Sequence, residues 1–505
     1  MSKTPETSVE VDDGTNYELR AARVVAQQPV QTRRSYFWDT LDKSPEERRF
    51  MFKLDAGLLT ITCLGFFIKY LDQANLVNAF VSGMKEDLNM FGNQLNYEST
   101  IFTVGSIVGN IPSNLLMTRI RPSIYLSTLM VFWSVLTMCL SRVTNYQQLY
   151  AFRFFIGLTE SGFYPGVEYM LGSWYRRDEL AKRAGIFNIT GSIATMFSGY
   201  LMSAVIGLDG RGGLRGWQWL YIMDRVISLP IAAASFFVLP DYPENSRVWY
   251  LNEGDKAIAK KRMELEGRRK RQPFTKKKVL KILSSWHLWI LPLPIFFCVG
   301  AGGAGQPIFA LYLKASKHPK YTIRQINNYP TTVPAMQAAS TLAYTWISDS
   351  VLRGRRWPII LWATSINFVV FTSLAAWNIP VGWHWACYIL MGQGVAISPI
   401  MMAWTNELCS GDTEERALVL AVVNDFLPLM NIWLPLIIWQ QVDAPRYHTG
   451  FITASCLIVV GFFLVLGVLY LTRRDEKRKR REENVPETDT AHSSGEDSVV
   501  QDKSV

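Results

Sequence analysis

The chain has little charge over most of its length. Charged residues make up 19% of its 505 residues, and hydrophobic residues make up 49%. The charges gather in the first 55 residues, in residues 241–284 and after Thr472, so that long stretches are almost uncharged. A soluble chain of this length would divide into several domains with polar surfaces. The distribution therefore excludes that class and indicates a membrane protein.

Motifs of catalysis and metal binding are also scarce. The six cysteines stand singly, without a pairing pattern or metal spacing, and are expected to be small buried hydrophobic residues. The five histidines belong to no recognisable triad or metal motif, and no Walker loop that would bind ATP occurs. We therefore expect no enzyme, no cofactor and no metal site.

The formal net charge is +10, but the basic runs lie beside apolar segments. Zinc spacing and interleaved aromatic and basic residues, which would favour nucleic-acid binding, do not accompany these runs. Basic residues that flank apolar segments are typical of the cytoplasmic membrane surface. We therefore expect contact with membrane lipids and none with nucleic acid.

Twelve apolar stretches are long enough to span a membrane, which takes about 20 residues. Six precede a central hydrophilic segment and six follow it. The expected spans are residues 56–80, 98–118, 122–141, 147–172, 184–206, 217–239, 286–313, 328–348, 357–377, 383–405, 416–440 and 449–472. The sequence therefore predicts an all-α membrane protein with twelve transmembrane helices in two six-helix bundles.

The predicted organisation follows from where the basic residues lie. The predicted parts are a cytoplasmic N-terminal tail (1–54), a first bundle (55–240), a basic cytoplasmic linker (241–284), a second bundle (285–472) and a disordered cytoplasmic tail (473–505). The lysines and arginines of the linker and of TRRDEKRKRREE place both segments on the cytoplasmic side under the positive-inside rule. The loop KASKHPKYTIR (314–324) would then face outside, against that rule.

Charged and amide side chains interrupt the first expected span in FFIKYLDQANLVNAF (66–80). Lys69 and Asp72 lie one helical turn apart and can meet on one face, with Gln73 and Asn75 beside them. A charge at the centre of a bilayer costs several kcal/mol, so it needs a partner or a water-filled cavity. These residues are therefore a candidate site, and an ion pair that only locks the helices together is the alternative.

The fourth expected span, AFRFFIGLTESGFYPGVEYML, repeats this signal. Arg153 and Glu160 lie seven residues apart, two turns along one face. Arg153 could hold a carboxylate of a substrate with two hydrogen bonds, or it could pair permanently with Glu160. Asn188 in the fifth span and Gln306 in the seventh are further candidates, although a single amide inside a membrane is often a contact between helices.

A loop motif then connects the chain to a known family. SDSVLRGRR (348–356), between the eighth and ninth spans, resembles the loop signature of the major facilitator superfamily, an acidic residue followed by basic ones. The residues of this expected gating loop are Asp349, Arg353, Arg355 and Arg356. The counterpart TRIRPS (118–123) keeps Arg119 and Arg121 but lacks the acidic residue and the glycine.

Longer motifs make the resemblance more specific. They are YFWDTLDKSPEERRFMFKLD, KYLDQANLVNAFVSGMKEDL, RFFIGLTESGFYPG, WYRRDELAKRAGIFN, LPDYPENSR and WLPLIIWQQVDAPRYHTGF. These motifs resemble the fungal anion:cation symporter (allantoate permease) family, in particular its pantothenate transporter-like branch, from about Tyr36 to about Arg474. One departure is Asp224-Arg225, where members of the family usually carry Glu-Gly.

The resemblance implies the major facilitator fold and a monomeric, proton-coupled importer of a small organic anion, most specifically pantothenate, in a fungal plasma membrane. The substrate-binding residues that it implies are Lys69, Gln73, Asn75, Arg153, Asn188 and Gln306. Asp72 or Glu160 would carry the coupling proton. The alternatives are the same transporter with biotin, allantoate, nicotinate or a secondary metabolite as substrate, and a nutrient sensor that does not transport. Export by the same machine also stays open.

Overall fold

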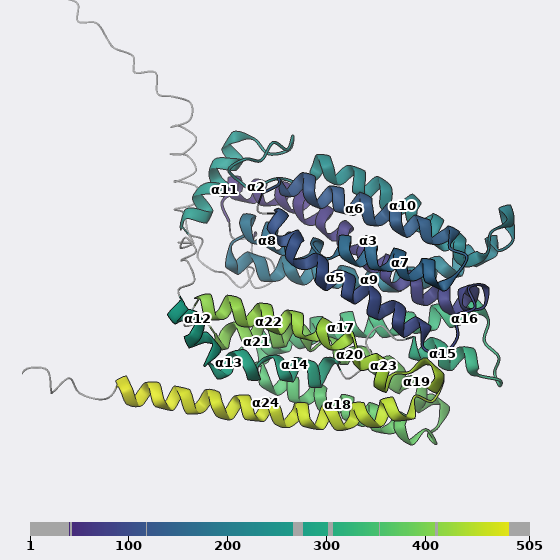
Figure 1. The fold of residues 1–505 in the computed structure, drawn as a ribbon. Helices are drawn as coiled ribbons and strands as arrows, with labels where there is room; N and C mark the ends of the chain where they lie inside the picture. Colours follow the sequence, from purple (N-terminus) through teal and green to yellow (C-terminus); the bar gives the residue numbers. More distant parts are fainter. Residues whose placement is uncertain are drawn as a thin grey trace, which may run out of the picture.

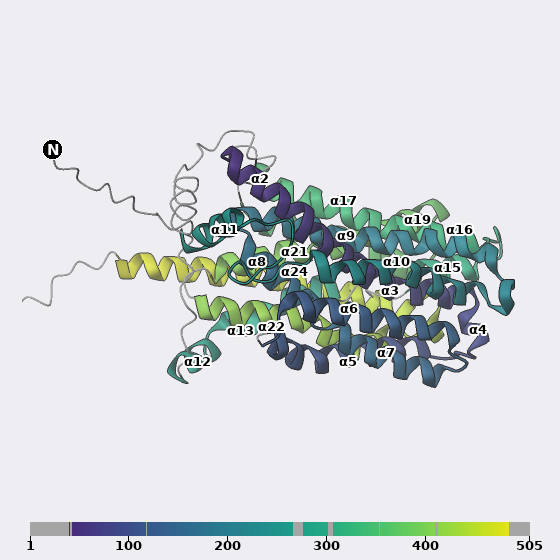
Figure 2. The same cartoon turned by 90° about the horizontal axis from the view of Figure 1, so that it is seen from above.

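The computed structural model describes residue 40 and residues 43–117, 119–265, 276–300, 307–352, 354–409 and 413–483. These residues form helices and connecting loops, with no strand among them. The all-α membrane fold that the sequence predicts is therefore confirmed. The helices form two bundles that lie side by side, one above the other in Figure 1 and one behind the other in Figure 2.

The first bundle begins with a helix that the local sequence defines well. Ser44 caps its start by accepting a hydrogen bond from the main-chain N–H of Glu47, and Pro45 occupies the first helical position. The helices of this half are α2 (Pro45–Leu54), α3 (Thr60–Ala79), α4 (Lys85–Asp87), α5 (Gln94–Met117), α6 (Pro122–Cys139), α7 (Tyr146–Glu160), α8 (Phe163–Trp174), α9 (Arg177–Val205) and α10 (Gly216–Val238).

Two helices of the linker, α11 (Glu253–Leu265) and α12 (Lys276–Leu283), lie between the halves in sequence. The helices of the second half are α13 (Trp286–Ile290), α14 (Pro292–Val299), α15 (Ile308–Ala315), α16 (Ile323–Asn328), α17 (Thr332–Trp346), α18 (Trp357–Ala376), α19 (Val381–Leu390), α20 (Gly392–Val395), α21 (Ser398–Leu408), α22 (Thr413–Asn431), α23 (Leu434–Ile438) and α24 (His448–Glu483). The last helix therefore continues beyond residue 472 into the segment that was expected to be disordered.

Among the described residues, nine helices are long and apolar enough to cross a membrane, compared with twelve expected spans. The expected span 147–172 is divided into α7 and α8 at Ser161 and Gly162. The span 286–313 is divided into α13, α14 and α15, and part of it lies outside the described residues. In the span 328–348, α17 is only 15 residues long before the helix changes to a wider turn at Ile347. These three expected spans are the ones that are not among the nine helices.

The two ends of the molecule differ in how the halves meet. We call the end that carries α11 and α12 the linker end, and the end that carries residues 316–322 the far end (Figure 1). At the far end, Asn96 of α5 donates hydrogen bonds to the carbonyl oxygens of Pro435 and Trp439 at 3.0 and 2.8 Å. Asn327 of α16 donates to Ser82 at 2.9 Å. These contacts join the halves at the far end.

The buried apolar side chains show the same asymmetry. One core cluster contains the interior of the first half and continues into the second half at the far end, through residues such as Ile326 and Trp439. The part of the second half at the linker end, which includes Leu288 and Ile360, packs into a separate cluster. Among the described residues, the halves therefore share an apolar core at the far end and pack into separate cores at the linker end.

Candidate functional site: a buried charge cluster in the first half

The helix α3 carries four of the predicted site residues, and it packs between α9 and α10. Asp72 and Asn75 are buried, at 2% and 0% exposure, whereas Lys69 and Gln73 are half-buried. Because residues three or four apart share a helix face, these side chains point toward the interior of the bundle rather than toward lipid. The polar face that the sequence predicts is therefore present.

Glu160 connects α3 to α7. Its carboxyl oxygen Oε2 accepts a hydrogen bond from Nε2 of Gln73 at 2.9 Å, and Nζ of Lys69 donates to its carbonyl oxygen at 3.4 Å. That carbonyl is available because α7 ends at Glu160, and the last carbonyls of a helix have no partner within it. Lys69 thus contacts Glu160 of α7, a partner that the spacing of Lys69 and Asp72 in the sequence did not indicate.

Arg153 has a partner that sequence reasoning missed. Its Nε forms an ion pair with Glu98 of α5, and its guanidinium group lies 4.4 Å from the ring centre of Phe102. The permanent pair of Arg153 with Glu160, one of the two interpretations of the sequence, is therefore not formed. Glu98 is the first residue of the expected second span, where a charge at the membrane surface would need no partner. In the structure Glu98 is fully buried.

Glycines allow this pairing because they bring α5 and α7 together. A Cβ atom on Gly105 would lie 2.3 Å from the carbonyl oxygen of Phe154, and one on Gly157 would lie 2.2 Å from that of Phe102. No side chain fits at such distances, so the two backbones touch directly. The close approach puts Glu98 within reach of Arg153.

Asp72 and Asn75 have partners on other helices. Oδ2 of Asp72 accepts a hydrogen bond from Thr137 of α6 at 3.4 Å, and Oδ1 of Asn75 accepts one from Ser198 of α9 at 2.6 Å. Nδ2 of Asn78 also donates to Ser198, at 2.6 Å. The cluster therefore includes side chains from α3, α5, α6, α7 and α9, all in the first half.

The structure does not bring every predicted residue into this cluster. The amide of Asn188 donates to the carbonyl oxygen of Ala184 in its own helix, at 2.8 Å. Gln306 lies outside the described residues. The roles of these two residues therefore stay predictions.

The expected gating loop lies at the linker end of the second half. Arg356 forms an ion pair with Asp349, and its Nη2 lies 2.9 Å from Oε1 of Glu407 in α21. Burial lowers the pKa of Arg356, but hydrogen bonds to Glu407 and Asp349 outweigh that effect and leave the pKa raised. Arg355 is exposed, and Arg353 lies outside the described residues. Arg356 thus joins the loop to α21.

The counterpart loop of the first half is held differently. Asp241, after the end of α10, accepts hydrogen bonds from the main-chain N–H and the hydroxyl of Ser123 at 3.2 and 2.6 Å. Arg119 and Arg121 line a cavity of about 690 Å³ beside it. This cavity lies at the linker end and contains none of the residues of the charge cluster, so the two features are separate.

The two helical halves, and the charge cluster buried in the first of them, can be compared with known proteins. The profile described as Major Facilitator Superfamily matches residues 62–427, which is more than half of the chain. The chain belongs to the major facilitator superfamily. The membership that the loop motif predicted is confirmed, and the chain is a membrane transporter rather than an enzyme.

Similar proteins of this superfamily are found in fungi. The chain is 35% identical to the pantothenate transporter liz1 of Schizosaccharomyces pombe, over 89% of this chain and 87% of that protein. It is 35% identical to the MFS transporter PfmaC of Pestalotiopsis fici, over 89% and 85%. It is 32% identical to the pantothenate transporter FEN2 of Saccharomyces cerevisiae, over 90% and 89%. The resemblance to fungal pantothenate transporters is therefore confirmed.

A solved structure agrees with the fold. The D-xylose-proton symporter superimposes with a TM-score of 0.61, and the match covers 82% of this chain and 97% of the other. The sequence identity is 11%, so the likeness concerns the fold alone.

Proposed function

We propose that this superfamily member imports pantothenate together with protons across the fungal plasma membrane by alternating access. The observation that carries the proposal is the similarity, over about nine tenths of the chain, to two transporters named for pantothenate. Pantothenate is a monocarboxylate with hydroxyl and amide groups. The buried cluster offers two cations, Lys69 and Arg153, and the amides of Gln73 and Asn75, which suit those groups.

The geometry supports a division of roles within the cluster. Lys69 is half-buried and has one long hydrogen bond among the described residues, to a carbonyl oxygen, so it has donors left for a carboxylate. Arg153 is already paired with Glu98 and stabilises the site electrostatically or exchanges that partner for the substrate. We therefore assign first contact with the substrate carboxylate to Lys69.

The orientation is part of the proposal. Both α11 and α12 carry basic side chains at the linker end, and the positive-inside rule places such an end in the cytoplasm. The contacts between the halves at the far end would then close the outer side. The structure would represent a state that opens inward, and both termini would be cytoplasmic.

Uptake of labelled pantothenate tests the proposal. The chain is expressed in a fungal strain that lacks its own pantothenate uptake, and accumulation is measured at an acidic and at a near-neutral external pH. We expect growth rescue and greater accumulation at the acidic pH. Accumulation that is equal at both pH values would contradict proton coupling. Absence of uptake would contradict the assignment of pantothenate as the substrate.

The alternative is the same transporter with another carboxylate. It is favoured by the equal identity to PfmaC, whose name specifies no substrate. Labelled biotin, allantoate and nicotinate are tested in the same cells. Uptake of one of them without any uptake of pantothenate would transfer the assignment to that compound, and binding without uptake would indicate a sensor.

A further inference from the structure

Two buried carboxyl groups, Asp72 of α3 and Asp224 of α10, face each other where these helices pack together. They are 2% and 1% exposed. Neither carboxyl oxygen of Asp224 has a well-aligned hydrogen bond to any described residue, and the same holds for Oδ1 of Asp72. Nη1 of Arg225, the sequence neighbour of Asp224, is also buried without a hydrogen-bond partner among the described residues, so it does not pair with Asp224. The pair therefore lacks the partners that buried carboxylates require.

The surrounding charges do not neutralise the pair either. The titratable groups that face it or lie beside it are Lys69 of α3, Glu98 of α5, Arg153 and Glu160 of α7, and Tyr221 of α10. Arg153 is paired with Glu98, and Lys69 lies at Glu160. Among the described residues, two cations thus stand against four carboxyl groups, and neither cation forms an ion pair with Asp72 or Asp224.

Two carboxylates in contact cannot both stay ionised where water is excluded, because each repels the other and each loses its hydration. One proton between them removes a charge and turns two acceptors into a donor and an acceptor. Nδ2 of Asn75, which also has no well-aligned partner, faces Asp224 and can donate to the remaining acceptor. A shared proton therefore satisfies all three side chains at once.

We propose that Asp224 and Asp72 together hold the coupling proton, which bridges the two carboxyl groups. The inference rests on the proposed function and adds Asp224, which the sequence left without a role. Binding forms one O–H bond from a proton taken up on the open side, and release breaks the same bond and returns the proton to water. Release leaves two carboxylates, so it needs the hydration that an open end provides. The access state of the transporter thereby determines whether the proton is bound or released.

The experiment compares Asp224→Asn, Asp72→Asn and the double variant in the uptake assay and in a counterflow assay, in which labelled substrate exchanges with unlabelled substrate inside. Both single variants are expected to lose accumulation and its pH dependence but to retain counterflow. The double variant should behave like either single variant, because each substitution alone already abolishes binding of the same shared proton. Asp425→Asn, in α22 of the other half, is the control and should match the wild type.

Either of two outcomes would overturn the inference. One is that uptake by Asp224→Asn keeps the pH dependence of the wild type. The other is that the double variant loses more accumulation than either single variant. If Asp224→Asn does not reach the membrane, Asp224→Glu replaces it. The conservative variant keeps a carboxyl group and should shift the pH dependence of uptake, and an unshifted profile would count against the pair.

Failure of the substrate assignment is a separate result. If wild-type protein moves labelled biotin but no pantothenate, the proposed substrate is wrong, and the same three variants are compared with biotin. The pH dependence of biotin uptake in the wild type and the three variants then tests the inference independently of pantothenate.

Discussion

At the scale of single residues, variants of the ion pair between Arg153 and Glu98 distinguish a structural role of Arg153 from a role in transport. Arg153→Met leaves the carboxylate of Glu98 buried without its cation, and breaking a buried ion pair in this way costs about 3–5 kcal/mol. We expect a lower melting temperature and no uptake. In the double variant Arg153→Met/Glu98→Gln the melting temperature should recover, because no uncompensated charge remains.

Uptake by that double variant decides the role of Arg153. If Arg153 takes part in substrate handling, uptake stays absent although the protein is folded. If uptake returns with the melting temperature, the pair only locks α5 to α7, and Lys69 alone remains as the cation for the substrate. Thermal unfolding in detergent and labelled uptake are the two measurements.

The sequence revealed the residues of the cluster more reliably than their partners. Lys69, Asp72, Arg153 and Glu160 are conspicuous because a charge inside an apolar run is expensive. Their pairing depends on how helices distant in sequence pack, as for Asp72 with Asp224 of α10. Helical periodicity describes one helix at a time, so it could not identify such contacts.

At the scale of helices, the contact of α5 with α7 depends on glycine. Gly157→Val places side-chain atoms where the carbonyl oxygen of Phe102 lies, 2.2 Å from the new Cβ. Because the obstacle is backbone, the helices must separate, and this weakens the packing around Arg153. We expect a clearly lower melting temperature and reduced uptake. Gly185→Ala in α9, where the new Cβ meets nothing within 4 Å, is the matched control and should leave both unchanged.

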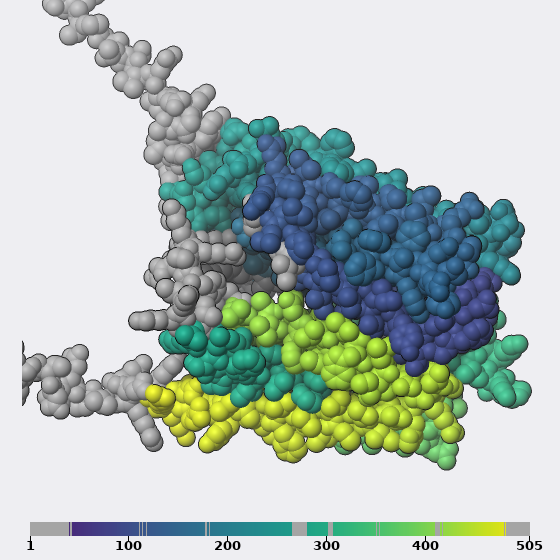
Figure 3. Space-filling model, in the orientation of Figure 1, coloured from purple at the N-terminus to yellow at the C-terminus, as the bar shows by residue number. Residues whose placement is uncertain are grey.

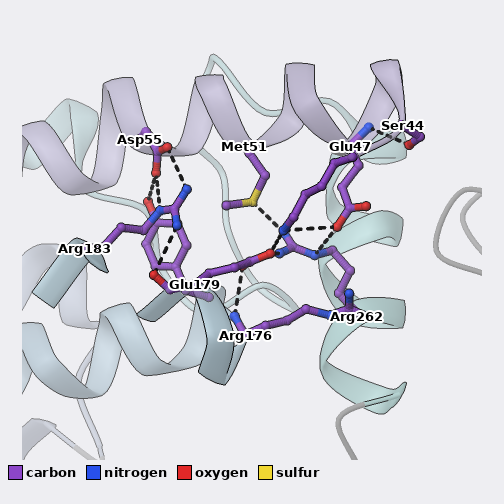
Figure 4. Close-up of polar contacts among 10 residues, drawn as sticks. Ser44, Glu47, Met51, Asp55, Arg176, Glu179, Arg183 and Arg262 are labelled. Carbon is purple, nitrogen blue, oxygen red and sulfur yellow. Dashed lines mark hydrogen bonds and ion pairs between the residues drawn. The ribbon is translucent and has the colours of Figure 1, made fainter. Parts of the chain in front are cut away.

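The linker helix α11 is more than a surface helix, although its sequence is mostly charged. Arg262 is fully buried and pairs with Glu179 of α9 and, at 3.1 Å, with Oε1 of Glu47 in α2 (Figure 4). Beside it, Arg183 of α9 pairs at 2.7 Å with Asp55. The sequence alone could not distinguish this buried arginine from the exposed basic residues of the linker, because its partners lie on helices that are distant in sequence.

Arg262→Ala tests this anchoring. It leaves the buried Glu47 and Glu179 with Lys43 as their shared cation. Because one cation then faces two carboxylates, we expect a loss of stability below the roughly 3–5 kcal/mol of a fully broken buried ion pair, and faster cleavage of the linker by trypsin. Lys261→Ala removes an exposed partner of Glu264 and should change neither stability nor the rate of cleavage elsewhere in the linker. Equal behaviour of the two variants would show that α11 is not held by Arg262.

At the scale of the whole molecule, the described parts of the two halves are joined by hydrogen bonds and by a shared apolar core. The space-filling view shows the halves in contact at the far end, to the right of Figure 3. Length and apolar composition predicted two bundles from the sequence. The access state could not be predicted, because one sequence must support both states of an alternating-access cycle and its pattern favours neither.

A reversible cross-link tests this state. Ser203 of α9 and Asn328 of α16 are hydrogen-bonded across the far end. In the variant Ser203→Cys/Asn328→Cys, an oxidant should form a disulfide that holds the far end closed. If the cycle requires this end to open, oxidation abolishes uptake and a reductant restores it, whereas each single cysteine variant is unaffected by either reagent. Efficient cross-linking with undiminished uptake would mean that the halves do not separate here, and the rocking of one half against the other would have to be abandoned.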